Sequence, residues 1–204
     1  MTSGVQKRIA VLASGRGSNF QALIDSEGGE VALLVCNVAA AGCLERARIA
    51  GIEAVVLDHK ASPTREAYDR ALLEVLKKHR IELVVLAGFM RLLTREFLNA
   101  FPHRVINVHP ALLPAFPGTH AVRQALDYGV KVTGCTIHFV DEGTDTGPII
   151  AQATVPVRDG DDEASLQLRI QEQEHLLFPR IVWALAHGRI SLHGRQVKIS
   201  EAAH

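Results

Sequence analysis

The sequence has few cysteines, no excess of charge of either sign and no apolar run of membrane length. Among its 204 residues, Lys and Arg number 22 and Asp and Glu also number 22, so the formal net charge is zero. Proteins that bind nucleic acid or membrane surfaces through basic patches carry a positive excess, and we therefore expect neither partner. The longest apolar stretch, residues 31–44, is interrupted by Asn37 and is shorter than the ~20 residues of a membrane span.

Cysteine and histidine spacing excludes two further classes. The three cysteines contain no C-x-x-C pair, which argues against a disulfide framework and a zinc knuckle, and the histidines show no H-x-x-x-H spacing. We predict no metal site. The first apolar run, residues 9–12, is too short for a secretory signal, so a soluble, cytoplasmic protein is expected.

Short apolar runs alternate with amphipathic segments in the first half of the chain. The expected strands are 9–13, 31–36, 54–57 and 83–87, and the expected helices are 20–25, 43–50 and 64–79. Near-continuous apolar runs are typical of strands buried on both faces. Their alternation with helices predicts a parallel sheet with right-handed crossovers.

The second half of the chain lacks this regular alternation of short apolar runs and amphipathic segments. A strand is expected at 104–108 and an irregular proline-rich loop at 110–118. Longer strands whose alternation suits antiparallel pairing are expected at 132–139 and 149–157, followed by a helix from Asp162 that Pro179 should break or kink. Residues 190–199 are expected to form a hairpin or an edge strand. The prediction is a single α/β domain over 1–204, with a Rossmann-like, open, mostly parallel twisted sheet, helices on both faces and an antiparallel C-terminal strand pair.

Three groups of polar residues could carry chemistry. Residues 14–19, Ser-Gly-Arg-Gly-Ser-Asn, join the first strand to the first helix. They match neither a dinucleotide-binding fingerprint nor a P-loop. The segment therefore either binds a single phosphate or is an ordinary turn. Asn107 and His109 lie on the same side of a strand end, suited to oxyanion stabilisation and proton transfer, or they are a turn cap beside a surface histidine. Asp145 could hold an imidazolium, or it could belong to a solvated turn.

The last helix carries polar residues on its apolar stripe. Gln173 and Glu174 interrupt the stripe formed by Leu166, Ile170 and Leu177. A polar pair in such a place either has partners in the interior or lines a pocket. We expect a pocket, because a buried glutamate without a cation is costly.

Four segments resemble the folate-dependent formyltransferases: residues 14–19, 86–93, 107–114 and 145–148. The similarity runs in order from about residue 8 to 189, and the Asn-x-His-Pro segment with its downstream aspartate is the most specific part. It is greatest to those members that formylate glycinamide ribonucleotide in purine biosynthesis. Ala111 stands where the family often has serine.

The resemblance implies transfer of a formyl group from 10-formyltetrahydrofolate, a co-substrate, to the amine of glycinamide ribonucleotide. It implies Asn107, His109 and Asp145 as catalytic residues. Its substrate-binding residues would be Gly17, Ser18, Asn19, Gln171, Gln173 and Glu174. Its folate-binding residues would be Arg65, Met90, Arg91, Leu92, Leu93, Asn107, Asp141, Glu142, Gly143, Thr144 and Asp145. Residues 8–100 would form the phosphate-binding half, 101–189 the catalytic and folate-binding half, and 190–204 a hairpin or tail.

Three other functions share part of this pattern of residues. A formyltetrahydrofolate hydrolase would need a regulatory domain before the first strand, and a methionyl-tRNA formyltransferase would need a further C-terminal domain and a basic surface. A non-catalytic nucleotide-binding module would need none of the three catalytic residues. We expect a transferase acting on small molecules, as a monomer or homodimer.

Overall fold

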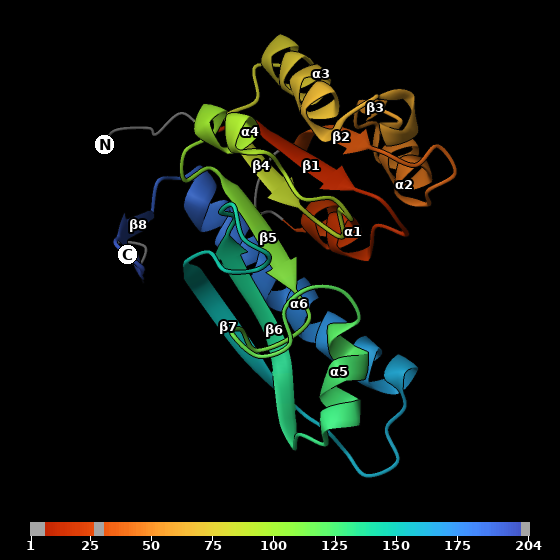
Figure 1. Cartoon of the computed structure of the whole chain (residues 1–204), viewed down its shortest axis with the longest axis vertical. Coiled ribbons are helices and arrows are strands. Elements are labelled where there is room, and N and C mark those ends of the chain that lie inside the picture. Colours follow the sequence, from red (N-terminus) through yellow and green to blue (C-terminus); the bar gives the residue numbers. More distant parts are fainter. Residues whose placement is uncertain (1–6, 27–30, 201–204) are drawn as a thin grey trace.

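Seven strands form one twisted sheet in the computed structural model, which describes residues 7–26 and 31–200 (Figure 1). The strand order is β3-β2-β1-β4-β5-β6-β7; β3 to β5 are parallel, and β6 is antiparallel to both neighbours. The strands are β1 (Ile9–Ala13), β2 (Val31–Cys36), β3 (Ala54–Val56), β4 (Leu83–Leu86), β5 (Val105–His109), β6 (Val132–Phe139) and β7 (Ile149–Pro156). The predicted fold class is confirmed.

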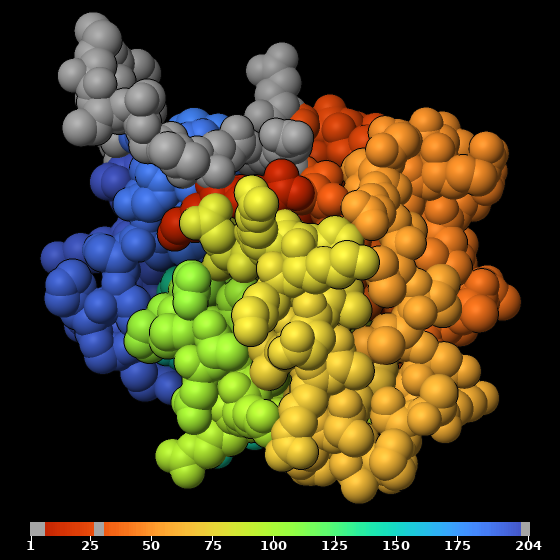
Figure 2. All heavy atoms as spheres, turned by 90° about the horizontal axis from the view of Figure 1, so that it is seen from above, coloured from red at the N-terminus to blue at the C-terminus, as the bar shows by residue number. Residues whose placement is uncertain are grey.

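Helices cover both faces of this sheet. They are α1 (Ser18–Asp25), α2 (Cys43–Ala50), α3 (Arg65–Lys78), α4 (Arg95–Ala100), α5 (Ala121–Tyr128) and α6 (Glu163–Ala186), with a 3-10 turn at His59–Ala61. One face packs on α1, α2 and α6, and the other on α3 and α4. In Figure 2 the yellow atoms of α3 lie between the orange segment before it and the green segment after it.

The central strands are buried because the side chains on both of their faces are apolar. Every residue of β1 and β4 is buried, so these strands at the centre of the sheet contribute side chains to the two cores on its opposite faces. A third, smaller core joins α5 and α6 to β6 and β7. The last predicted segment is a separate hairpin of β8 (Ile190–His193) and β9 (Gln196–Ile199).

Two expectations about helices need correction. Pro179 does not break α6, which continues through it from Glu163 to Ala186. Phe178, Pro179 and Val182 are all buried, and Phe178 and Val182 belong to the core on one face of the sheet, so packing holds the helix together despite the missing N–H donor. The short helices α4 and α5 were not predicted. None of the helices in the described residues is long and apolar enough to cross a membrane.

Candidate active site

The site begins where β5 ends. Asn107 and His109 alternate along β5, so both side chains point to the same side of the strand, as predicted. Antiparallel pairing with β6 places His138 opposite Asn107 and Thr136 opposite His109. Two polar side chains of β5 therefore meet two polar side chains of β6.

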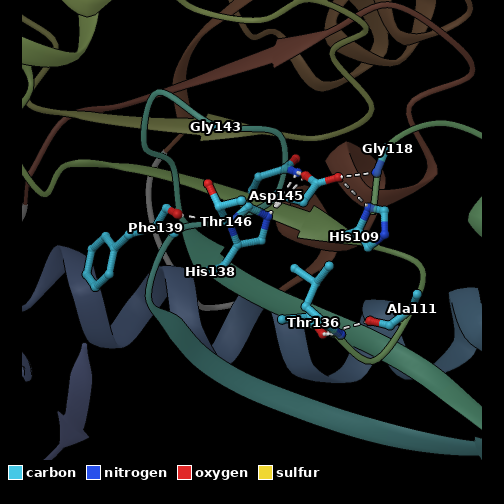
Figure 3. A network of polar contacts seen from close by, with 12 residues as sticks. His109, Ala111, Gly118, Thr136, His138, Phe139, Gly143, Asp145 and Thr146 are labelled. Atoms are coloured by element: carbon cyan, nitrogen blue, oxygen red, sulfur yellow. Dashed lines mark hydrogen bonds and ion pairs between the residues drawn. The ribbon is translucent and has the colours of Figure 1, made fainter. Parts of the chain in front are cut away.

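Asp145 joins this group from the loop that connects β6 to β7. Its Oδ2 lies 3.3 Å from His109 Nδ1 and accepts a hydrogen bond from the Gly118 backbone N–H at 2.8 Å. Its Oδ1 lies 3.5 Å from His138 Nε2 and 3.5 Å from Asn107 Nδ2. Figure 3 shows the carboxylate between the two imidazole rings. Asp145, which is far from Asn107 and His109 in the sequence, thus joins them in one cluster.

The hydrogen bonds around this cluster fix the orientation of its rings. His138 Nδ1 lies 2.9 Å from the carbonyl oxygen of Phe139, so this nitrogen carries a proton and donates it. His138 Nε2 lies 3.3 Å from Asn107 Nδ2 and 3.5 Å from Asp145 Oδ1, so it can accept a hydrogen bond from the amide or, when it carries a proton, donate one to the carboxylate. His109 Nε2 lies 2.8 Å from the Phe116 carbonyl oxygen, which can only accept. Both nitrogens of His109 thus face acceptors.

Burial governs the protonation of the cluster. Burial lowers the pKa of His109 below its ordinary value, more strongly than the charge of Asp145 and the Phe116 carbonyl raise it. Burial by itself would raise the pKa of Asp145, but hydrogen bonds from His138 and Gly118 and the field of His109 together lower it. Asp145 is therefore an anion at neutral pH. As expected from the sequence, the charge of Asp145 by itself raises the pKa of His109. Desolvation of the ring lowers that pKa by more, so the net pKa of His109 falls.

The cluster forms part of the wall of a cavity of about 900 Å³. Its lining includes the residues Met90, Arg91, Leu92, Leu93, Asn107, His109, Asp141, Glu142, Gly143, Thr144 and Asp145. Apolar side chains from the segment after β4 thus face the polar loop before β7 across one space. The volume is in the range of ligand sites, about 300–1,000 Å³.

Arg65 is the exception among the predicted folate-binding residues. It does not line the cavity, and its exposed side chain lies at the first turn of α3, with Nε 4.0 Å from Glu66 Oε1. A role for Arg65 stays a prediction.

The loop between β1 and α1 has the form of an anion site. Gly17 precedes α1 with φ +75°, and no side chain caps the helix, so its first N–H groups lack partners within the helix. A Cβ on Gly17 would lie 2.7 Å from the Cβ of Cys43, so only glycine fits between this loop and α2. Ser18 and Asn19 follow as the first helical residues.

Glu174 lies in the interior rather than in a pocket. It is 4% exposed, and its Oε2 accepts a hydrogen bond from Asn19 Nδ2 at 2.8 Å. Burial raises its pKa, an effect that the bond from Asn19 opposes. A neutral amide donor thus takes the place of the expected cation. Neither the cavity of about 900 Å³ nor a second groove, which Ser18 and His175 help to line, is lined by Glu174 or by the half-buried Gln171 and Gln173.

His138 is the residue of the cluster that the sequence reading missed. Its side chain is 2% exposed and touches both Asn107 and Asp145. The available signal was a histidine two residues after Thr136 on a strand that is buried almost throughout. Among the described residues, no three His, Cys, Asp or Glu side chains gather in a way that could hold a metal ion.

Comparisons with known proteins agree with one another. The model of the family described as "Formyl transferase" matches residues 7–182. The phosphoribosylglycinamide formyltransferase of Mycobacterium tuberculosis is 48% identical, with 94% of each chain covered, and that of Escherichia coli is 45% identical, covering 91% of this chain and 90% of the relative.

A crystal structure of glycinamide ribonucleotide transformylase 1 from Symbiobacterium toebii superposes with a TM-score of 0.95 at 48% identity, covering 98% of this chain and all of the other. The chain is also 50% identical to the trifunctional purine biosynthetic protein adenosine-3 of Drosophila pseudoobscura pseudoobscura. It spans only 14% of the length of that relative.

Proposed function

The chain belongs to the formyl transferase family, and on this premise we propose that it transfers a formyl group from 10-formyltetrahydrofolate to the amine of glycinamide ribonucleotide in purine biosynthesis. The relatives that match over nearly their whole length are named for this acceptor. One observation carries the proposal: Asn107, His109 and Asp145 meet on the wall of the large cavity. A binding module would have no need of this cluster.

We assign the formyl donor to the large cavity. Its apolar wall of Met90, Leu92 and Leu93 suits the flat pterin and benzoyl groups, and the loop 141–145 offers polar groups for the edge of the pterin. Arg91 lines the same space. The donor is a co-substrate that leaves after each turnover, and the proposal includes no metal.

We assign the phosphate of the acceptor to the start of α1. The N–H groups of Ser18 and Asn19 are suited to an anion, and Gly17 lets the ligand approach the backbone. The glycinamide end would lie toward Glu174, with Gln171 and Gln173 on the same helix. A cytoplasmic location and a monomeric or homodimeric state stay predictions.

The proposed reaction is a direct attack. The neutral amine forms a bond to the formyl carbon, and the carbonyl oxygen becomes an oxyanion that Asn107 and protonated His109 stabilise. Asp145 orients His109 and favours its charged form. The bond from carbon to folate N10 then breaks, and a proton moves from the amine to N10 through His109. Burial favours this transfer, because it lowers the pKa of His109 and so eases the release of its proton.

The test follows the absorbance change as formyl donor becomes tetrahydrofolate, with and without glycinamide ribonucleotide. We expect a signal only when the ribonucleotide is present. A signal without it would identify a hydrolase and overturn the assignment of the acceptor. No signal in either case would overturn the proposal as a whole, leaving a binding module.

A further inference from the structure

Asp145 has an unusual backbone conformation. Its φ is +55°, in the left-handed region that residues other than glycine rarely adopt. Such a conformation persists only where the surrounding contacts hold it, and it occurs where a side chain must be aimed at a site. The contacts of the loop between β6 and β7, residues 140–148, therefore decide where the carboxylate of Asp145 lies.

One set of hydrogen bonds lies within this loop. Asp141 Oδ1 accepts a hydrogen bond from Thr146 Oγ1 at 2.6 Å and another from the Gly143 backbone N–H at 3.2 Å. These bonds shape the loop but do not fix it relative to the sheet. Glu142 reaches outside the loop to Arg95 of α4 at 3.0 Å, but both side chains are exposed, and such ion pairs contribute little.

Arg195 connects the loop to a separate part of the fold. It lies in the turn between β8 and β9, and its Nη2 donates hydrogen bonds to the carbonyl oxygens of Thr146 at 2.9 Å and of Gly147 at 3.4 Å. These carbonyls belong to the two residues that follow Asp145 along the chain. The guanidinium is charged, so its hydrogen bonds are stronger than those between neutral groups. Arg195 does not line the large cavity, so any effect that it has on the reaction passes through the loop.

The hairpin of β8 and β9 is a firm base for this contact. Its turn contains only Gly194 and Arg195, because His193 pairs with Gln196 where the two strands end. Gly194 has φ +61°, which a tight two-residue turn requires at its first position. Three partly buried apolar side chains of the hairpin pack against the core on one face of the sheet: Ile190, Leu192 and Val197. Arg195 thus ties the loop that carries Asp145 to this core.

Resting on the proposed function, we infer that Arg195 is a positioning residue for Asp145. Its bonds to the two carbonyls after Asp145 keep the carboxylate against His109, at the 3.3 Å that separates Oδ2 from Nδ1. Without these bonds the left-handed conformation of Asp145 has fewer contacts to hold it, and the carboxylate should move away from His109. The loop also faces the proposed site of the formyl donor, so the donor should bind less well. The ribonucleotide, assigned to the start of α1, should bind as before.

The kinetic experiment compares Arg195→Met with Lys198→Met. Both residues are exposed on the hairpin and both substitutions remove one positive charge, but Lys198 lies on β9 and not in the turn. With both substrates saturating, we expect Arg195→Met to lower kcat roughly three- to thirty-fold, because small displacements of a catalytic group are costly. KM should rise for the formyl donor and stay unchanged for the ribonucleotide. Lys198→Met should change none of these values, and Arg195→Lys should recover part of kcat, since it keeps the charge and loses the planar fork.

A double-mutant cycle separates positioning from a general loss of stability. When Asp145→Asn is already present, adding Arg195→Met should lower kcat by less than about two-fold, because the carboxylate that Arg195 positions is gone. Losses that multiply in the double variant would make Arg195 a merely structural residue and overturn the inference. An unchanged kcat in the single variant Arg195→Met would overturn it as well.

The pKa of His109, followed by proton NMR, tests the inference without any turnover. Two titratable groups face the ring: the charge of Asp145 raises its pKa, and that of His138 lowers it. Loss of the positive charge of Arg195 by itself would raise the pKa of His109, whereas withdrawal of Asp145 lowers it. We therefore expect the pKa to fall in Arg195→Met and to stay unchanged in Lys198→Met.

The sign of this shift also separates the two proposals. A rise or an unchanged pKa of His109 in Arg195→Met would overturn the positioning role, whatever the activity of the wild type. If the wild type transfers no formyl group to the ribonucleotide while the pKa falls as expected, the proposed function fails and the placement of Asp145 by Arg195 stands.

Discussion

At the scale of single residues, Asn107 offers the most direct test of the catalytic cluster. Its Nδ2 lies at the end of β5 within reach of Asp145 and His138, on the wall of the cavity. Loss of one oxyanion donor costs about 10²–10³ in rate, so we expect Asn107→Ala to lower kcat by that factor with little effect on KM for the ribonucleotide. The exposed Asn99 of α4 provides the control, because Asn99→Ala should leave kcat unchanged. Near-normal turnover of Asn107→Ala would remove Asn107 from the mechanism.

Asp145→Asn should change both catalysis and the titration of His109. The charge of Asp145 raises the pKa of His109, against the larger opposite effect of burial. Asp145→Asn removes the negative charge that raises the pKa of His109, while the effect of burial remains. The pKa of His109 should therefore fall further. Proton NMR titration of the His109 ring in both proteins measures this shift, and kcat should fall with it. A higher pKa of His109 in the variant would contradict this account of the site.

The same substitution predicts how stability depends on pH. The folded state lowers the pKa of Asp145, so its ionisation stabilises the fold above the unfolded pKa of about 3.9. That contribution is lost as the pH falls through the lower, folded pKa. The difference in free energy of unfolding between the wild type and Asp145→Asn should therefore shrink below about pH 4. Urea unfolding at pH 7 and at pH 3 measures it.

Only part of this cluster could be predicted from the residues themselves. Asn107 and His109 share one side of a strand because side chains alternate, and this needs no tertiary information. His138 lies opposite Asn107 only through the register of β5 on β6, which neither strand specifies by itself. Asp145 reaches His109 through the path of a loop, and the resemblance to a family, not the local sequence, associated the two.

At the scale of elements, the turn from β6 to β7 controls where Asp145 lies. A Cβ on Gly147 would overlap the carbonyl oxygen of Phe139, so the backbone packs too closely there for any side chain. We expect Gly147→Ala to displace the loop 141–146, to lower stability by about 1–3 kcal/mol and to lower kcat through Asp145. Thermal unfolding and steady-state kinetics on the same preparation measure both effects.

Gly160→Ala is the matched control for that experiment. Gly160 has φ +84°, so an alanine there is strained by about 1–2 kcal/mol, yet its Cβ would meet no atom within 4 Å. It should lose comparable stability while retaining kcat. If both variants lost kcat equally, general destabilisation would explain the effect, and the link from Gly147 to Asp145 would be withdrawn.

The elements differ in how strongly the sequence marks them. The strands β1, β2 and β4 were predictable because their apolar runs are nearly continuous and end at turn residues. The helix α4 spans only 6 residues, too few for a clear periodic pattern, whereas α5 spans 8 residues, as the predicted helices α1 and α2 do, and was overlooked. In α6 the local signal of Pro179 was misleading, because tertiary burial on both sides of the proline outweighs one lost hydrogen bond.

At the scale of the whole molecule, the sheet brings the proposed phosphate loop and the catalytic cluster to the same edge. β1, β4 and β5 are adjacent and parallel, so the loops that follow them lie at one edge of the sheet (Figure 1). Ser14 connects two of these loops: its Oγ accepts a hydrogen bond from Met90 N at 3.0 Å and donates one to Asn37 Oδ1 at 2.6 Å. The two proposed binding regions are therefore neighbours with different lining residues.

This arrangement predicts that the two ligands stabilise the protein independently. Each ligand at a hundred times its Kd should stabilise the folded state by about 2.7 kcal/mol, or roughly 5–10 °C in Tm for a chain of this size. A non-reactive folate analogue and ribose 5-phosphate are added singly and together during thermal unfolding. The shifts should sum, because one ligand contacts the large cavity and the other the start of α1. A combined shift no larger than the greater single shift would mean that the ligands compete for one site, and the division of the sheet edge into donor and acceptor regions would then be wrong.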